Sequence, residues 1–446
     1  MPSSRPTPIP PDVVTRHTKS LGLQDLGRAS IRQIKRIVDL VEQDTGVKFV
    51  RMEMGIPGLP ALQLGVDAQI AALRQGVASL YPDIQGIEPV KREIARFVKL
   101  FLNIETAPEY CIPTVGSMMG ALAAFMTINR TWANREGTLF LDPGFPVQKQ
   151  QCKLLGHGYM SFDVSDFRGD KLGPKLESYL ATGKVSSILY SSPNNPAWIC
   201  LTEDELKTIG AMATKYGAIV IEDLAYFAMD FRQDYSKPGQ PPYQPTVARY
   251  TDNYVLLISS SKAFSYAGER IAMMVVSKKV WELKSPDLLR YFNSDQVGHA
   301  LLYDAVYAIS SGTSHSAQYA LTAMLKAVND GEIDFVSLVR EYGEKAKVMK
   351  KLFTENGFKI VYDKDLDAPI GDGFYFTFSY PGLSGSQLLA ELIHYGISAI
   401  TLGITGSAHP EGLRACTSLV RRDQFPVLEE RLKRFHEDHP VAKSAA

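Results

Sequence analysis

The chain has 446 residues, of which 45% are hydrophobic and 22% are charged, a composition typical of globular proteins with a large core. Lys plus Arg and Asp plus Glu number 48 each, so the net charge of zero provides no attraction to nucleic acid or to an anionic membrane surface. We therefore expect a small molecule as the partner, and the length favours two or three domains.

The four cysteines, Cys111, Cys152, Cys200 and Cys416, are far apart and form no CxxC pair. Their apolar or small-residue surroundings indicate buried free thiols, which fit a reducing compartment. Residues 1–14 lack the apolar segment of about 7–15 residues that a secretory signal needs, and no later window reaches about 18 uninterrupted apolar residues. The expected location is the cytoplasm, with no membrane as partner.

The first third of the chain predicts two helices separated by a Gly- and Pro-rich segment. Prolines within residues 2–11 exclude a helix there and predict an extended arm. Apolar residues recur at helical spacing in Ile31–Glu42. Gly and Pro interrupt regular structure over Met52–Pro60, where the backbone can approach a ligand closely. A second helix is predicted over Gly86–Val98, with a proline in its first turn.

The middle of the chain alternates strands and helices, as in a doubly wound α/β fold. Four apolar runs predict strands: Thr138–Leu141, Ser187–Tyr190, Ala218–Ile221 and Tyr254–Ile258. Each run is followed by polar, aromatic or turn residues. Because parallel strands end along one edge of their sheet, we expect one site to collect these residues. A capping box at Thr202–Glu205 predicts a helix that ends near Gly217.

The last third predicts a second domain of mixed helix and sheet. A helical stretch, Ala320–Glu355, is interrupted near Asn329–Asp334 and is followed by shorter segments such as Gly373–Phe378. We expect three regions: an N-terminal arm with part of the small domain over residues 1–60, a large cofactor-binding domain over 61–325, and a small C-terminal domain over 326–446.

Lys262 follows the last predicted strand, within the segment Ser259–Arg270. A strand that ends in hydroxyl residues and a lysine presents an amine nucleophile at the ligand-binding edge of the sheet. The hydroxyls of Ser259 and Ser261 and the guanidinium of Arg270 are suitable donors to a phosphate. Pyridoxal phosphate, an aldehyde with a phosphate group, needs both features. The alternative is a plain polar turn between a strand and a helix.

Three further side chains have both a functional and a structural interpretation, and a fourth, Tyr226, has a functional one. Asp223, at the end of a strand, can pair with a protonated pyridine nitrogen or cap the next helix. Tyr226 lies three residues on and can donate to a phenolate oxygen. Asn195 can donate to the same oxygen or form an ordinary Asn-Pro turn. Phe145 follows a Pro-Gly turn and can lie on a cofactor ring or belong to the core. The small residues of Thr114–Leu122 place a turn at a helix start, which is a natural anion site.

Together and in this order, these motifs resemble the fold-type I pyridoxal-phosphate enzymes, and within them the class I and II aminotransferases, from Gly55 to about Arg414. The resemblance implies a large α/β domain with a mostly parallel, seven-stranded sheet and a smaller α+β domain. It implies that Lys262 carries pyridoxal phosphate as a Schiff base and that Asp223 pairs with the pyridine nitrogen. The remaining implied cofactor contacts are Ser259, Ser261, Arg270, Gly116, Ser117 and Met118 at the phosphate, Tyr226 and Asn195 at the ring oxygen, and Phe145 on the ring.

The resemblance also implies a homodimer with shared active sites, in which Tyr81 reaches the phosphate of the neighbouring subunit. Arg414 matches the arginine that binds the substrate α-carboxylate, with Gly55 and Asn195 near the same group. The chain departs from the family pattern at Ala197–Ile199, where Thr-Gly usually follows Asn-Pro. A large indole therefore stands where a small residue is expected.

The expected reaction moves an amino group between an L-amino acid and a 2-oxo acid, with Lys262 transferring the proton and no metal taking part. Two other functions remain open. The same residues would serve a pyridoxal-phosphate-dependent β-eliminating lyase similar to cystathionine β-lyase. A ligand-sensing regulator would need a DNA-binding module, for which the roughly 50 residues before Gly55 leave little room. A dicarboxylate substrate would need a second arginine, and after the lysine motif Arg290 is a weak candidate.

Overall fold

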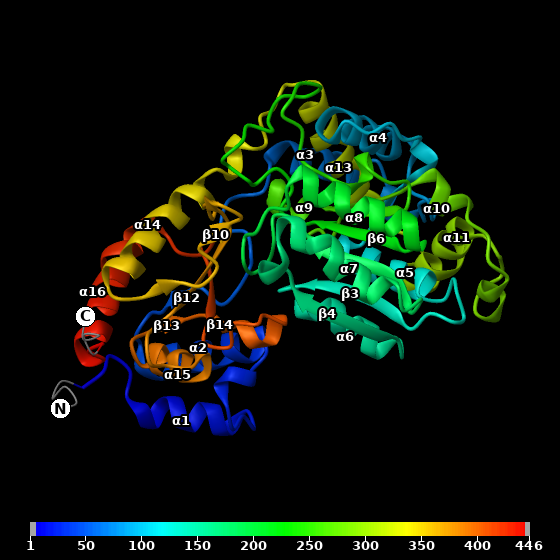
Figure 1. Cartoon of the computed structure of the whole chain (residues 1–446). Coiled ribbons are helices and arrows are strands. Elements are labelled where there is room, and N and C mark those ends of the chain that lie inside the picture. Colours follow the sequence, from blue (N-terminus) through cyan, green and yellow to red (C-terminus); the bar gives the residue numbers. More distant parts are fainter. Residues whose placement is uncertain (1–5, 442–446) are drawn as a thin grey trace. The chain divides into compact units, whose positions relative to one another are not determined.

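The structure is a computed structural model that describes residues 6–441 (Figure 1). The chain forms two compact units. Unit 1 contains the described parts of Met1–Gly58, Asn195–Ile199 and Arg340–Ala446, and unit 2 contains Leu59–Asn194 and Cys200–Val339. The domain boundaries expected near residues 60 and 326 stay a prediction. The predicted N-terminal arm lies partly outside the described residues.

Unit 2 is built on a seven-stranded sheet with the strand order β2-β8-β7-β6-β5-β3-β4. Within this sheet β8 runs antiparallel to both of its neighbours, and the other adjacent pairs are parallel. The four predicted strands correspond to β3, β5, β6 and β7 and are confirmed. The strands are β2 (Cys111–Thr114), β3 (Gly137–Asp142), β4 (Gly158–Asp163), β5 (Val185–Ser191), β6 (Ile219–Leu224), β7 (Tyr254–Ser259) and β8 (Ala272–Val276).

Helices connect these strands, as the alternating pattern predicted (Figure 1). The capping box at Thr202–Glu205 is present, and Gly217 ends the same helix in a left-handed conformation. One helix, α5, is apolar on nearly all sides and packs in the core with strand residues such as Leu257 and Met274. The principal helices are α3 (Gln63–Arg74), α4 (Glu88–Leu102), α5 (Gly116–Ile128), α6 (Pro146–Leu154), α7 (Leu172–Leu180), α8 (Glu203–Tyr216), α9 (Ser260–Ala263) and α13 (His315–Asn329).

Unit 1 combines a four-stranded antiparallel sheet, in the order β14-β15-β12-β9, with a two-stranded parallel pair, β1 and β13. This is the mixed helix and sheet that the last third of the sequence predicted. Its strands are β1 (Val50–Arg51), β9 (Lys359–Ile360), β12 (Tyr375–Ser379), β13 (Ile397–Ser398), β14 (Ile400–Thr401) and β15 (Leu413–Cys416). Its helices are α1 (Pro11–Ser20), α2 (Ile31–Thr45), α14 (Glu341–Glu355), α15 (Gly385–His394) and α16 (Phe425–Asp438).

The core of unit 1 joins the two ends of the sequence. The apolar face of α2, which includes Ile34 and Val38, packs with Leu388 of α15 and Phe435 of α16. Strand β1 pairs with β13. The described part of the N-terminal segment is therefore integral to unit 1 and is not a separate module of the kind that a DNA-binding regulator would carry.

The cysteine prediction holds for three of the four thiols. All four cysteines are free, and Cys111, Cys152 and Cys416 are buried. Cys200 is only half-buried, because it lies in an irregular segment before α8 and not in a strand. Within residues 6–441 no helix is long and apolar enough to cross a bilayer.

Candidate functional site

Lys262 lies in the short helix α9, directly after β7, and is half-buried. Two hydrogen bonds fix the turn before it. The hydroxyl of Ser259 accepts from the backbone nitrogen of Ser261 at 3.1 Å, and the hydroxyl of Ser260 donates to the carbonyl of Ile271. The amine therefore comes from a segment whose turn is held by both hydrogen bonds.

The polar ends of neighbouring strands meet at one edge of the sheet, as predicted. Ser191 at the end of β5 lies opposite Asp223 of β6, and Asp223 lies opposite Leu257 of β7, two residues before Ser259. The loop after β5 is also tied to the loop after β3, because the amide of Asn194 donates to the carbonyl of Pro143 at 2.8 Å.

Asp223 is a buried carboxylate whose hydrogen bonds come from neutral donors. Its oxygens accept from the amide of Gln148 at 2.8 Å and from the backbone nitrogen of Ala225 at 3.1 Å. Burial raises the pKa of this carboxyl to about 6, although both hydrogen bonds act in the opposite direction. A turn follows the strand, so the alternative in which Asp223 caps a helix is wrong. A buried acid without a cationic neighbour suits a protonated ring nitrogen.

Four of the predicted phosphate contacts, Arg270, Gly116, Ser117 and Met118, come together at the start of α5. Gly116 begins the helix with φ of +69°, and a side-chain carbon at this position would lie 2.4 Å from Nη2 of Arg270. The guanidinium of Arg270 thus lies against the helix N-terminus, where backbone N–H groups have no partner within the helix. The buried hydroxyl of Ser117 has no hydrogen-bond partner in the part of the chain that the structure describes. Met118 lies in the same turn, and hydrogen-bond donors of this kind at a helix N-terminus could receive an anion.

The aromatic candidates occupy different surroundings. Phe145 is half-buried and directly precedes α6, the helix that carries Gln148. Tyr226 is buried in the turn after β6. Tyr81 is 92% exposed and lies before α4, so this single chain does not place it among the other phosphate contacts. Arg290, the weak candidate for a second arginine that a dicarboxylate substrate would need, is exposed.

Arg414 lies on β15 in unit 1 and is only 2% exposed. Its guanidinium donates to the side-chain oxygen of Asn195 at 3.2 Å and to the backbone carbonyl of Glu53 at 2.6 Å. The guanidinium carbon lies 4.5 Å above the ring centre of Tyr375. No carboxylate in the described residues lies within 4.0 Å, and the Nε–H group is buried without a partner. The alternative of a solvated surface ion pair is therefore wrong.

A buried guanidinium without an acidic partner is costly, because low-dielectric surroundings do not solvate its charge. Its unused donors suit a planar carboxylate. Gly55, the other residue expected near a substrate carboxylate, packs against Tyr375, since a side-chain carbon at Gly55 would lie 2.1 Å from the tyrosine oxygen. Asn195, Arg414 and Gly55 are thus brought together around Tyr375.

Trp198, the departure from the family pattern, is fully buried in unit 1 with φ of +64°. The indole lies against Gly373, where a side-chain carbon would come within 2.0 Å of the ring. It also meets Tyr375 edge to face, with ring centres 6.3 Å apart. The large residue is accommodated by a glycine across from it, and it packs behind the aromatic ring that supports Arg414.

Sequence reasoning missed three residues of these sites: Gln148, Tyr375 and Glu53. Gln148 binds Asp223 from 75 residues away, and no local pattern marks it. Tyr375 could have been inferred from strand pairing, because Thr377 lies opposite Arg414 and Tyr375 is its diagonal neighbour on the same face. Glu53 stands in the Gly- and Pro-rich segment that was expected to approach a ligand.

Comparisons with known proteins agree with the fold. A family model described as aminotransferase class I and II matches residues 55–432. The LL-diaminopimelate aminotransferase of Natranaerobius thermophilus is 23% identical over 397 residues, which cover 88% of this chain and 92% of that protein. A mutant aspartate aminotransferase of Thermus thermophilus has a TM-score of 0.74 at 17% identity, covering 91% of this chain and 97% of that one. The aspartate aminotransferase of Thermotoga maritima has a TM-score of 0.73 at 18% identity, covering 95% and 99%.

Proposed function

Because this chain belongs to the class I and II aminotransferases, we propose that Lys262 and the residues around it bind pyridoxal phosphate and move an amino group between an L-amino acid and a 2-oxo acid. The family match and the structural neighbours confirm the predicted enzyme class and the fold-type I architecture. The family uses pyridoxal phosphate, whose ring withdraws electrons from the substrate Cα when it is bound.

The observation that carries the site assignment is the carboxylate of Asp223. It is buried, its pKa is raised, and its contacts are neutral, so a ring nitrogen that carries a proton would be a complementary partner. At the other end of the sheet edge, Arg270, Ser117 and the first turn of α5 would hold the phosphate, with Gly116, Met118, Ser259 and Ser261 completing the set. Phe145 would cover the ring, and Tyr226 and Asn195 would donate to its oxygen.

On the substrate side, Arg414 would bind the α-carboxylate, supported by Asn195 and with Gly55 nearby. A fork of two nitrogens holds a planar carboxylate in one orientation, so the Cα–H bond is presented in a fixed direction to the base, Lys262. The family match favours transfer over β-elimination. Release of pyruvate and ammonia without transfer to a 2-oxo acid would instead identify a lyase.

The direct test is to locate the cofactor. Borohydride reduction of the purified yellow protein should fix the cofactor on Lys262, and peptide mass spectrometry should find the adduct there. Lys262→Ala should abolish amino transfer and retain the fold, which circular dichroism checks, because the side chain is half-buried in a four-residue helix and contributes little to the core. An adduct on another lysine, or none, would overturn the site assignment.

The proposed assembly is a homodimer in the cytoplasm. Tyr81 is exposed beside Leu80, and Ile70 and Leu73 of α3 expose 41% and 45% of their surface. Large apolar side chains exposed together are typical of a protein interface. A second copy of the chain covering this surface would bury them and bring Tyr81 to the neighbouring phosphate, in agreement with the family resemblance.

A further inference from the structure

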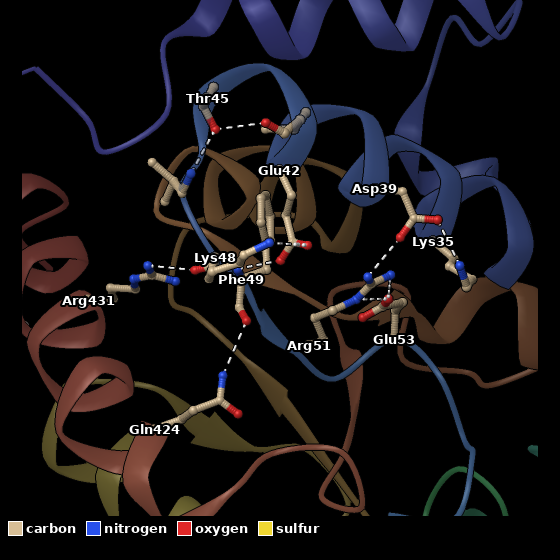
Figure 2. Close-up of polar contacts among 12 residues, drawn as sticks. Lys35, Asp39, Glu42, Thr45, Lys48, Phe49, Arg51, Glu53, Gln424 and Arg431 are labelled. Carbon is tan, nitrogen blue, oxygen red and sulfur yellow. Dashed lines mark hydrogen bonds and ion pairs between the residues drawn. The ribbon is translucent and has the colours of Figure 1, made fainter.

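Glu53 is held by an ion-pair network in unit 1 (Figure 2). Arg51, at the end of β1, directs Nε and Nη2 to one carboxylate oxygen of Glu53 at 2.9 and 2.7 Å. Its Nη1 binds Asp39 of α2 at 2.7 Å, and Lys35 binds the other oxygen of Asp39 at 2.7 Å. The second oxygen of Glu53 accepts from the hydroxyl of Ser398 on β13 at 2.6 Å.

Glu53 also touches Arg414, but only through its backbone carbonyl at 2.6 Å. Glu53 is 0% exposed and Arg414 is 2% exposed. Opposite charges in such surroundings attract strongly, because little water screens them. Within the described residues, however, the ion pair of Glu53 is made to Arg51 and none is made to Arg414. The guanidinium of Arg414 is thus hydrogen-bonded to the backbone of Glu53, while the carboxylate of Glu53 is paired with Arg51.

The partners of Glu53 are well fixed. Burial acts to lower the pKa of Arg51, but the charge of Glu53 and the hydrogen bonds to Asp39 and Glu53 outweigh it and raise the pKa. Burial acts to raise the pKa of Asp39, and the hydrogen bonds from Lys35 and Arg51 outweigh it and lower the pKa. Arg51 is also fixed through its backbone, because β1 pairs with β13 in register, Arg51 opposite Ser398. Arg51 therefore stays charged and stays in place.

We propose that Arg51 is a positioning residue for substrate: by binding the carboxylate of Glu53, it prevents that carboxylate from pairing with Arg414 and leaves the guanidinium open to a substrate α-carboxylate. This inference rests on the proposed function, in which Arg414 receives that carboxylate. The role of Glu53 toward Arg414 is then limited to its backbone carbonyl, which orients the guanidinium without neutralising it.

The test compares three variants of the holoenzyme: Arg51→Met, Glu53→Gln and the double variant. In Arg51→Met the carboxylate of Glu53 loses its cation and turns to Arg414, so the KM for the amino donor should rise roughly tenfold or more. Glu53→Gln carries no competing charge, and its KM is the reference with which the double variant is compared. The double variant should recover the same KM, because removing the carboxylate removes the competitor. If Arg51 had only a structural role, adding Glu53→Gln would not restore the KM of Arg51→Met.

A second readout does not depend on turnover. Calorimetric titration with pyruvate, a small 2-oxo acid, should show weaker binding to Arg51→Met and restored binding to the double variant, while the cofactor absorbance stays that of wild type. Arg421→Met is the matched control, because Arg421 lines the same cavity of about 440 Å³ as Arg51 but is bound to Asp423 at 2.9 and 3.0 Å. It should leave KM and pyruvate affinity unchanged.

The outcomes distinguish a failure of the Arg51 inference from a failure of the proposed function. If Arg51→Met retains the wild-type KM and pyruvate affinity, or if the double variant is as impaired as the single one, the inference is wrong. If the wild type transfers no amino group, the proposed function is wrong, and the pyruvate titrations still decide whether Arg51 controls access to Arg414. Should Arg51→Met fail to fold, Arg51→Gln also removes the charge but keeps a hydrogen-bond donor, and the same rescue by Glu53→Gln is expected.

Discussion

At the scale of single residues, the contacts of Arg414 separate orientation from neutralisation. An amide oxygen, a backbone carbonyl and the face of an aromatic ring hold the guanidinium, and none of them carries a full negative charge. Neutral partners fix its direction and leave its charge for a ligand. The two hydrogen bonds come from different nitrogens of the planar guanidinium, an arrangement that the single nitrogen of an ammonium group does not reproduce.

Arg414→Lys should therefore lower kcat/KM for amino donors by an amount equivalent to about 2–4 kcal/mol of transition-state stabilisation. The absorbance of the bound cofactor and its affinity should hardly change. Single-turnover kinetics of the first half-reaction measure the effect. Arg422→Lys is the control, since this exposed arginine makes a two-nitrogen contact with Glu341 in the same unit. Unchanged half-reaction kinetics in Arg414→Lys would remove this residue from the site.

At the scale of elements, the end of a parallel strand can place a buried charged group, which is costly to ionise, where a bound ligand can neutralise its charge. Asp223 belongs to β6, whose six residues are all buried, so the strand carries its carboxylate into the sheet. The neutral amide of Gln148 comes from α6, the helix after the neighbouring loop. Within the described residues neither element supplies Asp223 with a cation, because Lys149 of α6 binds Asp142 instead. The cost of ionising Asp223 is thus built into the apoprotein and would be relieved by a protonated ring nitrogen.

This cost should be visible in the stability of the apoprotein. Burial raises the pKa of Asp223 from its ordinary value of 3.8 to about 6, so the folded chain binds this proton more tightly than the unfolded chain. Its contribution to stability is present below about pH 4 and is lost as the pH rises through 6. Between pH 4.5 and 7.5, Asp223→Asn should gain about 1–2 kcal/mol relative to wild type in urea unfolding of the two apoproteins. Identical pH dependence of the two proteins would contradict the assignment.

At the scale of the whole molecule, Tyr81 is the predicted site residue that a single chain does not explain. It is 92% exposed and follows Leu80, which is 61% exposed, whereas the proposed phosphate contacts Gly116 and Arg270 lie against each other. An interface with a second copy accounts for both observations. It also means that each active site would take residues from two chains.

Subunit mixing tests this arrangement. Tyr81→Ala and Lys262→Ala should each impair the enzyme when they form homodimers. After the two are unfolded and refolded together, heterodimers should contain one intact site, and activity should recover to about a quarter of wild type. Each variant refolded alone serves as the control. If mixing restores no activity, the sites are self-contained and Tyr81 does not act across an interface.

By itself the sequence determined the strands, the helix caps and the residues at the strand ends. Apolar periodicity and turn residues are carried by neighbouring positions, so Tyr254–Ile258 and Lys262 could be identified without knowledge of the rest of the chain. The family resemblance then supplied the roles of these residues, and it covers the segment that the family model matches.

Only the tertiary structure decided which groups neutralise one another. Arg414 meets Glu53 across 361 residues and Asn195 across 219, and Asp223 meets Gln148 across 75. Whether a buried charge has a partner depends on side chains that the fold brings together from distant positions, and no local pattern encodes it. The sequence therefore shows that Arg414 and Glu53 are present, whereas the fold pairs the carboxylate of Glu53 with Arg51, and Arg414 pairs with no carboxylate among residues 6–441.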